Sequence, residues 1–462
     1  MREVLYYINL LFFAYFVFIN GFYLYLIVIS AHTVRRYARV SAMTEYEGIF
    51  GTTFYKPVTV IVPAHNEEET IVHTVASALA VRYPELEVVA VNDGSTDGTM
   101  DALIRAFDLV PAPGVVRCDI PCAPIRGLYD SMTYSGLRVV DKDQGGKADA
   151  LNAGINVSSF PLVCNIDADS IIDVQSMVQI TRPFLEDHRV VAVGGVVMPA
   201  NDCVIENGEV KQVRLARSGL ARFQIVEYLR AFLFGRMGWS RLNAVMIISG
   251  AFAIFRRTAL IEVGGYRTDT VGEDMELILR MHRVFYDKKK QYRILFLPDP
   301  ICWTQVPEDM KSLSKQRRRW QRGLAESLMK NRRLCLNRRY GGVGLLGFPF
   351  FVFCELLSPA IEVVGYFIVA TAIVAQAIDW QLAVTFLACA MLLGTIMSMS
   401  SLLLEAVAFR KYPSLRDTLI LSGYAFLESF GYRQLHSFWR CRGLADFVTK
   451  RGSWGQPVRR AF

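Results

Sequence analysis

The chain has 462 residues, more than one ordinary domain requires, and 33 glycines and 17 prolines exclude a collagen-like or disordered protein. Hydrophobic residues make up 52% and charged residues 20%, so we expect one part in lipid and another part that is a water-facing globule. The net charge of +8 suits nucleic acid, anionic lipid or a phosphorylated substrate. The distribution of that charge must decide between these partners.

Three long apolar segments predict membrane-spanning helices, at residues 5–29, 348–375 and 382–409. At about 1.5 Å per residue, each is long enough for a hydrocarbon core of about 30 Å. The apolar stretch at residues 418–430 is short for a span, and we expect an interfacial or re-entrant segment there.

The basic residues set the expected orientation. Arg35, Arg36 and Arg39 follow the first apolar segment, which by the positive-inside rule leaves the N-terminus outside and brings the chain into the cytoplasm. A fourth span would carry the basic C-terminal tail outside, against the same rule. We therefore expect three spans, with the middle domain and the tail in the cytoplasm.

Three glutamates lie within or beside these apolar segments, and two interpretations of them stay open. They are Glu355, Glu362 and Glu428. They lie either at helix ends and the membrane interface, or along a polar cavity or channel.

From Lys56 the pattern changes to alternating strands and helices. Strands are expected at residues 58–62, 88–91, 162–166 and 190–197. Helices are expected at residues 68–81, at 147–156 and after Asp173. Strand–helix–strand units predict an α/β domain with a parallel sheet, whose ligands bind beyond the carboxyl ends of the strands.

Polar residues follow three of these strands, at residues 63–67, 92–95 and 167–169. Any one cluster also fits a turn or a helix cap. All three at one edge of a sheet predict a shared crevice. Asp167 and Asp169 supply alternate carboxylates of the kind that hold magnesium or manganese together with substrate phosphates.

The residues Gly145, Gly146 and Lys147 resemble a phosphate-binding turn, although Walker spacing is absent. At the start of a helix, Lys147 could reach a diphosphate.

Taken in order, these motifs are similar to those of the membrane-embedded family-two glycosyltransferases, which include cellulose, hyaluronan, chitin and poly-N-acetylglucosamine synthases. The chain most resembles the bacterial poly-N-acetylglucosamine type, over about residues 56–331 and the flanking helices. The matching sequences are VPAHNE at 62–67, NDGS at 92–95, GKADALN at 146–152, DAD at 167–169, GED at 272–274 and QRRRW at 316–320. The last of these, in the form QxxRW, is the most specific.

The resemblance implies a GT-A-like fold, a UDP-sugar donor and inversion at the anomeric carbon. It assigns the nucleotide to Pro63, His65, Glu67, Asp93, Lys147 and Asp167. It assigns the diphosphate to Lys147 and Arg319, a Mg²⁺ or Mn²⁺ ion to Asp169 with Asp167, the general base to Asp274 beside Glu273, and the acceptor to Gln316 and Trp320. Many members carry another residue type at the positions of Ala64 and His65, so the uracil contact there departs from the family pattern.

Each of these residues has a role in the chemistry of sugar transfer, and several also have a purely structural interpretation. An attacking hydroxyl must lose a proton, and Asp274 could take it, but Glu273 and Asp274 are also ordinary first-turn residues favoured by a helix dipole. Lys147 and Arg319 would stabilise the charge on leaving UDP. Trp320 offers a face for a sugar ring, and tryptophan is also common at membrane interfaces.

The basic segment at residues 311–339 is expected to be an amphipathic helix in the membrane interface, with its cations toward anionic lipid. Its apolar residues along one expected face are Leu313, Trp320, Leu324, Leu328 and Met329. No helix-turn-helix, zinc or aromatic-platform motif supports nucleic-acid binding by this segment, so we expect no nucleic-acid partner.

The expected organisation has five parts: a transmembrane helix (1–34), a cytoplasmic GT-A-like domain (35–307), the interfacial helix with QxxRW (308–340), two transmembrane helices (341–411), and an interfacial or re-entrant segment with a basic tail (412–462). We expect an enzyme of the plasma (inner) membrane.

The leading hypothesis for its function is processive transfer from UDP-N-acetylglucosamine to a growing polysaccharide. Export of that polymer would need a homo-oligomer or an accessory subunit, because three spans form only a narrow channel. The alternatives are single transfer to a lipid or short acceptor and, more distantly, a non-catalytic scaffold or transport component.

Overall fold

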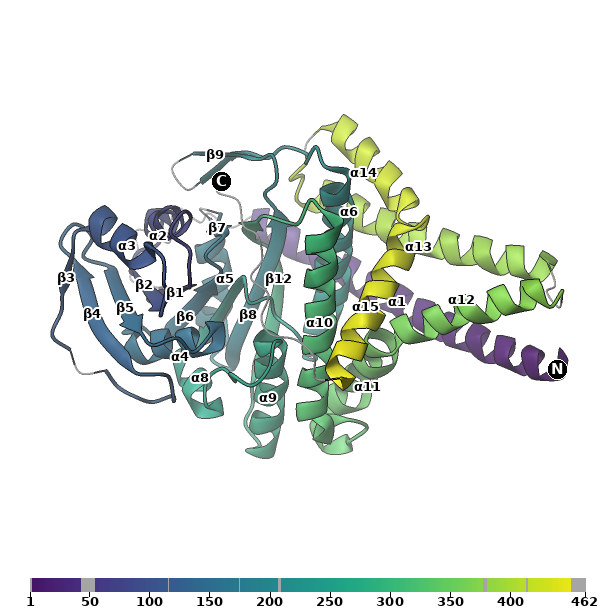
Figure 1. Ribbon diagram of the computed structural model, residues 1–462, viewed down its shortest axis with the longest axis horizontal. Coiled ribbons are helices and arrows are strands. Elements are labelled where there is room, and N and C mark those ends of the chain that lie inside the picture. Colours follow the sequence, from purple (N-terminus) through teal and green to yellow (C-terminus); the bar gives the residue numbers. More distant parts are fainter. Residues whose placement is uncertain are drawn as a thin grey trace.

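The computed structural model describes residues 2–42, 55–114, 116–173, 175–206, 209–376, 380–412 and 414–449. An α/β domain lies at one end, and long helices extend from its other side (Figure 1). The basic tail expected at the C-terminus falls largely on residues 450–462, which lie outside the described residues.

Ten of the described strands form one sheet, in the order β3-β4-β5-β2-β1-β6-β11-β8-β12-β7. At its centre β1 pairs in parallel with β2 and β6, whereas β11 runs antiparallel between β6 and β8. The strands are β1 (Val58–Ala64), β2 (Leu86–Asp93), β3 (Leu109–Pro111), β4 (Ile125–Ser131), β5 (Leu137–Lys142), β6 (Leu162–Ile166), β7 (Ser170–Ile172), β8 (Val190–Pro199), β11 (Phe252–Arg256) and β12 (Arg293–Thr304). The sheet is therefore parallel at its centre, as predicted, and mixed overall. A separate ribbon pairs β9 (Val204–Glu206) with β10 (Glu209–Gln212).

Helices cover both faces of the sheet, which explains why its central strands are apolar without interruption. In β1, Val60 and Val62 pack into one core and Ile61 into the other. The first core includes α2 (Ile71–Ala80), α3 (Thr99–Phe107), α5 (Ser176–Glu186) and α6 (Gly219–Leu229). The second includes α4 (Lys147–Val157), α7 (Met237–Arg241), α8 (Arg257–Val263) and α9 (Glu273–Asp287).

The predicted elements recur with small shifts at their ends. The strand predicted at residues 162–166 is β6 (Leu162–Ile166), and the helix predicted at 147–156 is α4. The helix predicted from residue 68 begins only at Ile71, because the preceding residues form a turn in which the N–H of Thr70 bonds to the carbonyl of Glu67 at 3.0 Å.

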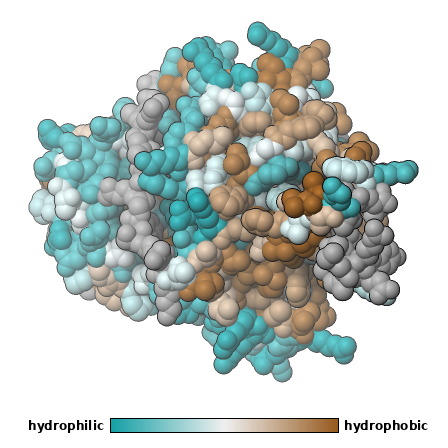
Figure 2. Space-filling model, turned by 45° about the vertical axis from the view of Figure 1, so that its right-hand side comes forward, coloured by the Kyte–Doolittle hydropathy of each residue, from teal (hydrophilic) through white to brown (hydrophobic). Residues whose placement is uncertain are grey.

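Three helical segments of the described chain are long and apolar enough to cross a membrane, as predicted: Leu10–Arg39, Val343–Val374 and Ala383–Ala408. The second combines the short elements η5 (Val343–Gly347), α11 (Phe348–Phe350) and η6 (Phe351–Leu356) with α12 (Ser358–Val374), and the third lies in α13 (Trp380–Ala408). Large apolar side chains such as Phe367 and Val374 are exposed on these helices, and Figure 2 shows brown, apolar residues gathered on that side. Apolar surface of this extent indicates contact with lipid or with another apolar partner.

The first helix, α1 (Arg2–Ala42), is longer than a span requires. Towards its end Leu26, Ser30 and Val34 are buried, at intervals of four residues that bring them onto one face. The hydroxyl of Ser30 donates to the carbonyl of Phe234 at 2.8 Å. The second half of α1 is therefore packed against the α/β domain.

After α13 the chain returns through α14 (Leu415–Leu427) to α15 (Tyr432–Val448), which packs along α10 (Met310–Lys330) and α12. The predicted short apolar segment at residues 418–430 is thus mainly α14, and its position relative to a membrane stays a prediction.

The three glutamates of the apolar segments pair with other helices. Glu355 accepts from the hydroxyl of Tyr23 at 2.7 Å and from Arg440 at 3.2 Å, and Glu362 accepts from Ser437 of α15. Glu428 is fully buried and accepts bonds of 2.5 Å from Arg230, Ser398 and Arg433. These glutamates therefore hold α1, α12, α13 and α15 to one another and to the domain.

Candidate active site

The three polar clusters predicted from the sequence meet at one edge of the sheet. β1 lies between β2 and β6, and all three strands run in the same direction. Residues 63–67, 92–95 and 167–169 therefore follow neighbouring strand ends, which is where ligands of such sheets bind.

Asp93 is almost fully buried, at 2% exposure, and both of its carboxylate oxygens have partners. It pairs with Lys142 at 2.6 Å and accepts from the backbone N–H groups of Gly145 and Gly146 at 2.9 and 2.7 Å. Lys142 is itself fully buried and also pairs with Asp149 at 2.7 Å. In this structure Asp93 therefore shapes the turn before Lys147, and its uridine contact stays a prediction.

His65 and Glu67 border the same turn. The Nδ1 atom of His65 lies 2.9 Å from the carbonyl oxygen of Asp93, and its Nε2 atom lies 3.3 Å from the side-chain nitrogen of Gln144. Glu67 accepts from the hydroxyl of Thr70 at 2.8 Å and is half-buried. Pro63, by contrast, is buried in β1, so it supports the residues at the edge of the sheet and does not itself face a ligand.

The centre of the edge holds a compact group of charges. Lys147, the first residue of α4, pairs with Asp167 and lies 3.8 Å from a carboxylate oxygen of Glu273. Asp274 accepts from the backbone N–H of Gly250 at 3.3 Å. A methyl group on Gly250 would lie 3.3 Å from the Lys147 ammonium nitrogen and 3.6 Å from the Asp274 Cβ, so this glycine lets the two side chains approach.

Both charged partners in this group have perturbed pKa values. Burial lowers the pKa of Lys147, but the negative charges of Asp167, Glu273 and Asp274 outweigh it and raise that pKa above its ordinary value. Burial raises the pKa of Glu273, and Asp274 raises it further against the opposing effects of Lys147 and Arg319. The lysine therefore stays cationic at neutral pH, which suits it to an anionic ligand.

Asp274 stands in the first turn of α9, where the helix dipole favours a carboxylate. One of its oxygens accepts from the backbone N–H of Met275 at 2.7 Å, which fixes the carboxylate at the helix start.

The residues of the QxxRW motif lie on α10. Arg319 and Trp320 are exposed, and Trp320 is covered on one side by the guanidinium of Arg317, 4.3 Å from the ring centroid. The side-chain oxygen of Gln316 is buried without a hydrogen-bond partner in the described chain. Trp320 thus presents ring surface beside an unpaired acceptor atom, an arrangement that suits a sugar.

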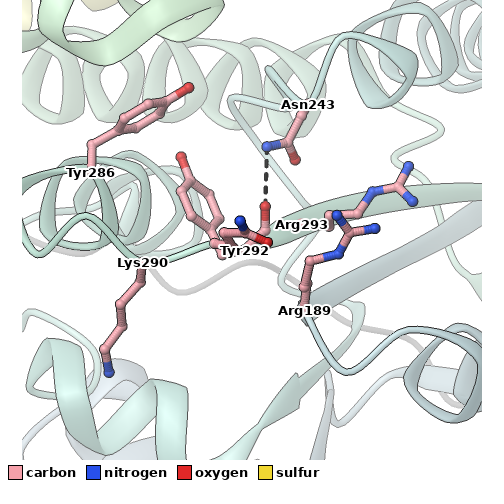
Figure 3. Close-up of a pocket in the computed structure, with 7 residues that line it drawn as sticks. Arg189, Asn243, Tyr286, Lys290, Tyr292 and Arg293 are labelled. Atoms are coloured by element: carbon pink, nitrogen blue, oxygen red, sulfur yellow. Dashed lines mark hydrogen bonds between the residues drawn. The ribbon is translucent and has the colours of Figure 1, made fainter.

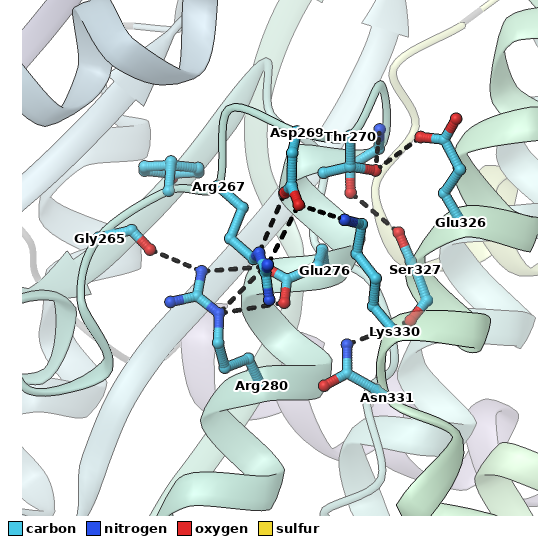
Figure 4. A network of polar contacts seen from close by, with 12 residues as sticks. Gly265, Arg267, Asp269, Thr270, Glu276, Arg280, Glu326, Ser327, Lys330 and Asn331 are labelled. Atoms are coloured by element: carbon cyan, nitrogen blue, oxygen red, sulfur yellow. Dashed lines mark hydrogen bonds and ion pairs between the residues drawn. The ribbon is translucent and has the colours of Figure 1, made fainter. Parts of the chain in front are cut away.

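α10 is bound to the loop before Asp274 by a polar network (Figure 4). Glu326 accepts from the hydroxyl of Thr270 and the N–H of Val271, both at 2.9 Å, and Ser327 donates to the carbonyl of Gly272 at 3.1 Å. Lys330 pairs with Asp269 at 2.5 Å. This network sets the position of the motif residues relative to Asp274.

The surroundings of α10 differ in part from those expected for an amphipathic helix in the membrane interface. Leu313 and Leu328 are buried whereas Trp320 and Met329 are exposed, so the apolar residues do not share one face. Lys311, Lys315 and Arg319 are exposed, and the position of α10 at a membrane interface stays a prediction. Its other four basic side chains bond to protein carboxylates. These pairs are Arg317 with Glu227, Arg318 with Asp446, Arg322 with Glu326 and Lys330 with Asp269.

The carboxylates at the end of β6 fit a hard divalent cation bound together with substrate. Asp169 follows Asp167, whose carboxylate also pairs with Lys147. Within the described ranges no group of three or more His, Cys, Asp or Glu side chains is arranged to hold a metal. Mg²⁺ is commonly bound through one or two carboxylates, water and substrate phosphates, and this donor set matches that description.

Sequence reasoning missed two cations: Lys142, which is fully buried and pairs with Asp93, and the half-buried Arg236. Lys142 ends β5 and Arg236 ends the π-helical segment η2 (Arg230–Arg236). Neither belongs to a motif. Lys142 follows the apolar residues of β5, which is a weak signal, and Arg236 lies inside an apolar stretch without one.

A separate surface cavity of about 430 Å³ contains none of the predicted site residues (Figure 3). Its lining includes Arg189, Arg293 and Lys290. The two arginines pair with Asp187 and the lysine with Glu262, so these cations are largely neutralised.

Comparisons with known proteins agree with this geometry. Residues 162–402, just over half of the chain, match the family described as Glycosyl transferase family group 2, and residues 59–120 match Glycosyl transferase family 2. The poly-beta-1,6-N-acetyl-D-glucosamine synthase of Staphylococcus epidermidis is 29% identical over 289 residues, covering 62% of this chain and 58% of that protein. The Staphylococcus aureus (strain COL) protein of the same name is 29% identical over 275 residues, covering 59% and 56%. The chain therefore spans under two thirds of these relatives.

A solved mannosyltransferase from Pyrobaculum calidifontis, in complex with GDP-Man and Mn²⁺, has a TM-score of 0.54 and 19% sequence identity, covering 95% of this chain and 99% of that one. At this identity the likeness establishes the fold. The fold and the edge site thus define a glycosyltransferase with a GT-A-like domain, as the resemblance implied. The chain belongs to Glycosyl transferase family group 2.

Proposed function

We propose that this protein transfers N-acetylglucosamine from its UDP derivative to a growing polysaccharide, with inversion at the anomeric carbon. One observation carries the proposal. Lys147 contacts Asp167 and Glu273 at the strand-end edge, and Gly250 lies against both Lys147 and Asp274. The helix that bears Arg319 and Trp320 packs against the helix of Glu273 and Asp274. This combination offers cations for a diphosphate, carboxylates for a metal and a base, and an aromatic face for a sugar.

The donor would occupy the edge formed by residues 63–67, 92–95 and 145–147. His65 and Glu67 border the nucleotide, while Asp93 and Lys142 hold the turn that presents Lys147. Lys147 and Arg319 offset the charge on the diphosphate, a form of electrostatic stabilisation often worth about a hundredfold in rate for one donor. A bound Mg²⁺ or Mn²⁺ ion, held by Asp169 with Asp167, would supply further neutralisation of the leaving group.

In the transfer step, an acceptor hydroxyl forms a bond to the anomeric carbon as the bond to the UDP oxygen breaks. The electron pair of that bond leaves with UDP. Asp274 takes the hydroxyl proton, and its contacts with the N–H groups of Gly250 and Met275 hold its carboxylate for this purpose. Trp320 stacks on the acceptor sugar and Gln316 accepts a hydrogen bond from it.

The choice of sugar and of a polymer product is supported by the names of the Staphylococcus relatives, which match only part of their own length. The five-part organisation, with the α/β domain in the cytoplasm of the plasma membrane and the N-terminus outside, is supported by Arg35, Arg36 and Arg39 after the first apolar segment. Export of a polymer would require a second copy or an accessory subunit, because three spans from one chain enclose little space.

The test is UDP release by the full chain purified in detergent, with Mg²⁺ or Mn²⁺ and a panel of UDP-sugars. Radiolabelled products are separated by size and digested with glycosidases of known linkage. We expect release with UDP-N-acetylglucosamine and label in high-mass material that one glycosidase digests. Label confined to a short or lipid-soluble product would show a single-transfer enzyme and contradict the proposal of a polymer synthase. UDP binding without release, even with oligosaccharide acceptors and native membranes, would favour a non-catalytic component.

A further inference from the structure

Arg236 is a half-buried cation whose Nη1 atom is fully buried, and no motif assigns it a role. It is the last residue of η2, a π-helical segment between α6 and α7, and such segments are frequent at functional sites. η2 packs against β8 and β12 of the sheet on one side and against α1 and α13 on the other. Arg236 therefore lies between the domain and the apolar helices.

Within the described chain, Arg236 has ring contacts but no hydrogen bond or ion pair. Its guanidinium lies 4.2 Å from the ring centroid of Phe232 and 5.8 Å from that of Phe296, and the two rings are stacked. Its Nη1 atom is buried without an acceptor. A buried donor without a partner costs about 1–3 kcal/mol, more for a charged group, so a ligand that supplies an oxygen would relieve a substantial penalty.

Aromatic rings connect Arg236 to the part of the site that is proposed to bind the acceptor. The Tyr228 ring lies 5.7 Å from Phe232, on which Arg236 stacks, and 6.5 Å from Trp320. Burial lowers the pKa of Arg236 to about 10, and the groups that oppose this shift are Asp274 and Tyr228. The rings of Phe232, Tyr228 and Trp320 thus form a continuous row that connects Arg236 to the proposed acceptor ring.

We propose that Arg236 donates hydrogen bonds to an oxygen of the acceptor sugar, as a third acceptor residue beside Gln316 and Trp320. The inference rests on the proposed function, because it names the substrate that this group recognises. An acceptor hydroxyl or carbonyl oxygen would receive the Nη1 hydrogen bond. Phe232 and Phe296 fix the plane of the guanidinium and thereby the direction of its donors.

The test uses Arg236→Met, which removes the donors but keeps an apolar chain over Phe232, and Arg236→Lys, which keeps the charge without the planar fork. The matched control is Arg241→Met, an exposed arginine five residues further along. Binding of an N-acetylglucosamine oligosaccharide and of UDP is measured separately on the full chain in detergent, with Mg²⁺ present. Acceptor and donor KM values and the Tm are measured on the same preparations.

We expect Arg236→Met to weaken oligosaccharide binding and raise the acceptor KM about tenfold, with Arg236→Lys intermediate. The UDP affinity and the donor KM of both Arg236 variants should stay within about twofold of the wild-type values. For Arg241→Met, the oligosaccharide affinity and the acceptor KM should also stay within about twofold of wild type. The Tm should not fall, because the substitution removes a donor atom, Nη1, that is buried without a partner in the described chain.

Three results would overturn the inference. Unchanged oligosaccharide binding would do so, as would a loss confined to UDP, which would make Arg236 a donor residue. A fall in Tm of more than about 5 °C would show a structural role. Wild-type protein that binds the oligosaccharide but releases UDP from no donor would contradict the proposed function and leave this inference standing.

Discussion

Gly272 and Gly323 touch backbone to backbone where α9 and α10 meet. A methyl group on Gly272 would lie 2.8 Å from the Cα of Gly323, and one on Gly323 would lie 2.9 Å from the Cα of Gly272. Gly272 comes two residues before Asp274, and Gly323 follows Trp320 by three residues. This contact sets the distance between the proposed base and the proposed acceptor residues.

We therefore expect Gly323→Ala to separate the two helices and to lower kcat by about tenfold to a hundredfold, because small displacements of catalytic groups are costly. Affinity for UDP should change little. Steady-state kinetics and UDP titration of the purified full chain measure both. Gly423→Ala in α14, where an added methyl group meets nothing within 4 Å, is the control. Wild-type turnover in Gly323→Ala would show that this contact does not position the site.

Asp274→Asn should abolish transfer while leaving UDP binding largely intact, because the amide cannot accept the hydroxyl proton. Loss of a general base costs about 10²–10⁴ in rate. The measurement combines UDP release with UDP titration, and Asp101→Asn on the exposed face of α3 serves as the control. Normal turnover by Asp274→Asn would remove this residue from the role of base.

Lys142→Met should destabilise the domain strongly. The substitution leaves Asp93 and Asp149 without their shared buried cation, and breaking a buried pair in this way costs about 3–5 kcal/mol. The expected result is a lower Tm, together with faster proteolysis of the turn at residues 143–146. Lys288→Met, which removes an exposed lysine paired with Glu262, is the comparison. Equal Tm values for the two variants would contradict the role of Lys142.

His282 predicts a specific loss of stability in acid. Its ring nitrogens contact the Tyr292 hydroxyl at 2.7 Å and the Val245 carbonyl at 2.8 Å, and burial lowers its pKa from 6.5 to about 4. Between these two pH values the unfolded chain binds a proton at this position and the folded chain does not. The stabilisation is therefore complete above about pH 6.5 and lost as the pH falls towards 4, by roughly 3 kcal/mol at most.

The measurement is Tm against pH for the wild type and for His282→Gln. The variant should start lower but lose less stability between pH 6.5 and pH 4. Parallel curves would show that His282 does not titrate between the folded and unfolded states as its burial implies.

The sequence predicted the fold best where the local pattern of apolar and polar residues agrees with the observed structure. The strand at residues 162–166 was predicted with its observed bounds, because four of its five residues are apolar and the polar cluster begins directly after it at Asp167. The meeting of three polar clusters followed from the direction of parallel strands. The family resemblance added roles for Asp274 and Arg319 that spacing alone could not supply.

The remaining features depend on contacts between residues far apart in the chain. The burial of Asp93 against Lys142 cannot be inferred from a turn sequence, because the lysine comes from another strand. The partners of α10 were missed for the same reason: its arginines look like a lipid-facing stripe until Glu227 and Asp446 are brought beside them. Arg236 lies in an apolar stretch, and no pattern there marks it as different from its neighbours.

The course of α1 has a practical consequence for work with this enzyme. Leu26, Ser30 and Val34 of this helix fill positions in the cores of the α/β domain, although the same helix begins as a candidate membrane span. A soluble version trimmed to start after residue 42 would expose the surface that these side chains cover. We therefore expect that detergent or lipid is needed to study even the chemistry of the α/β domain, because its folding unit includes a helix long and apolar enough to cross a membrane.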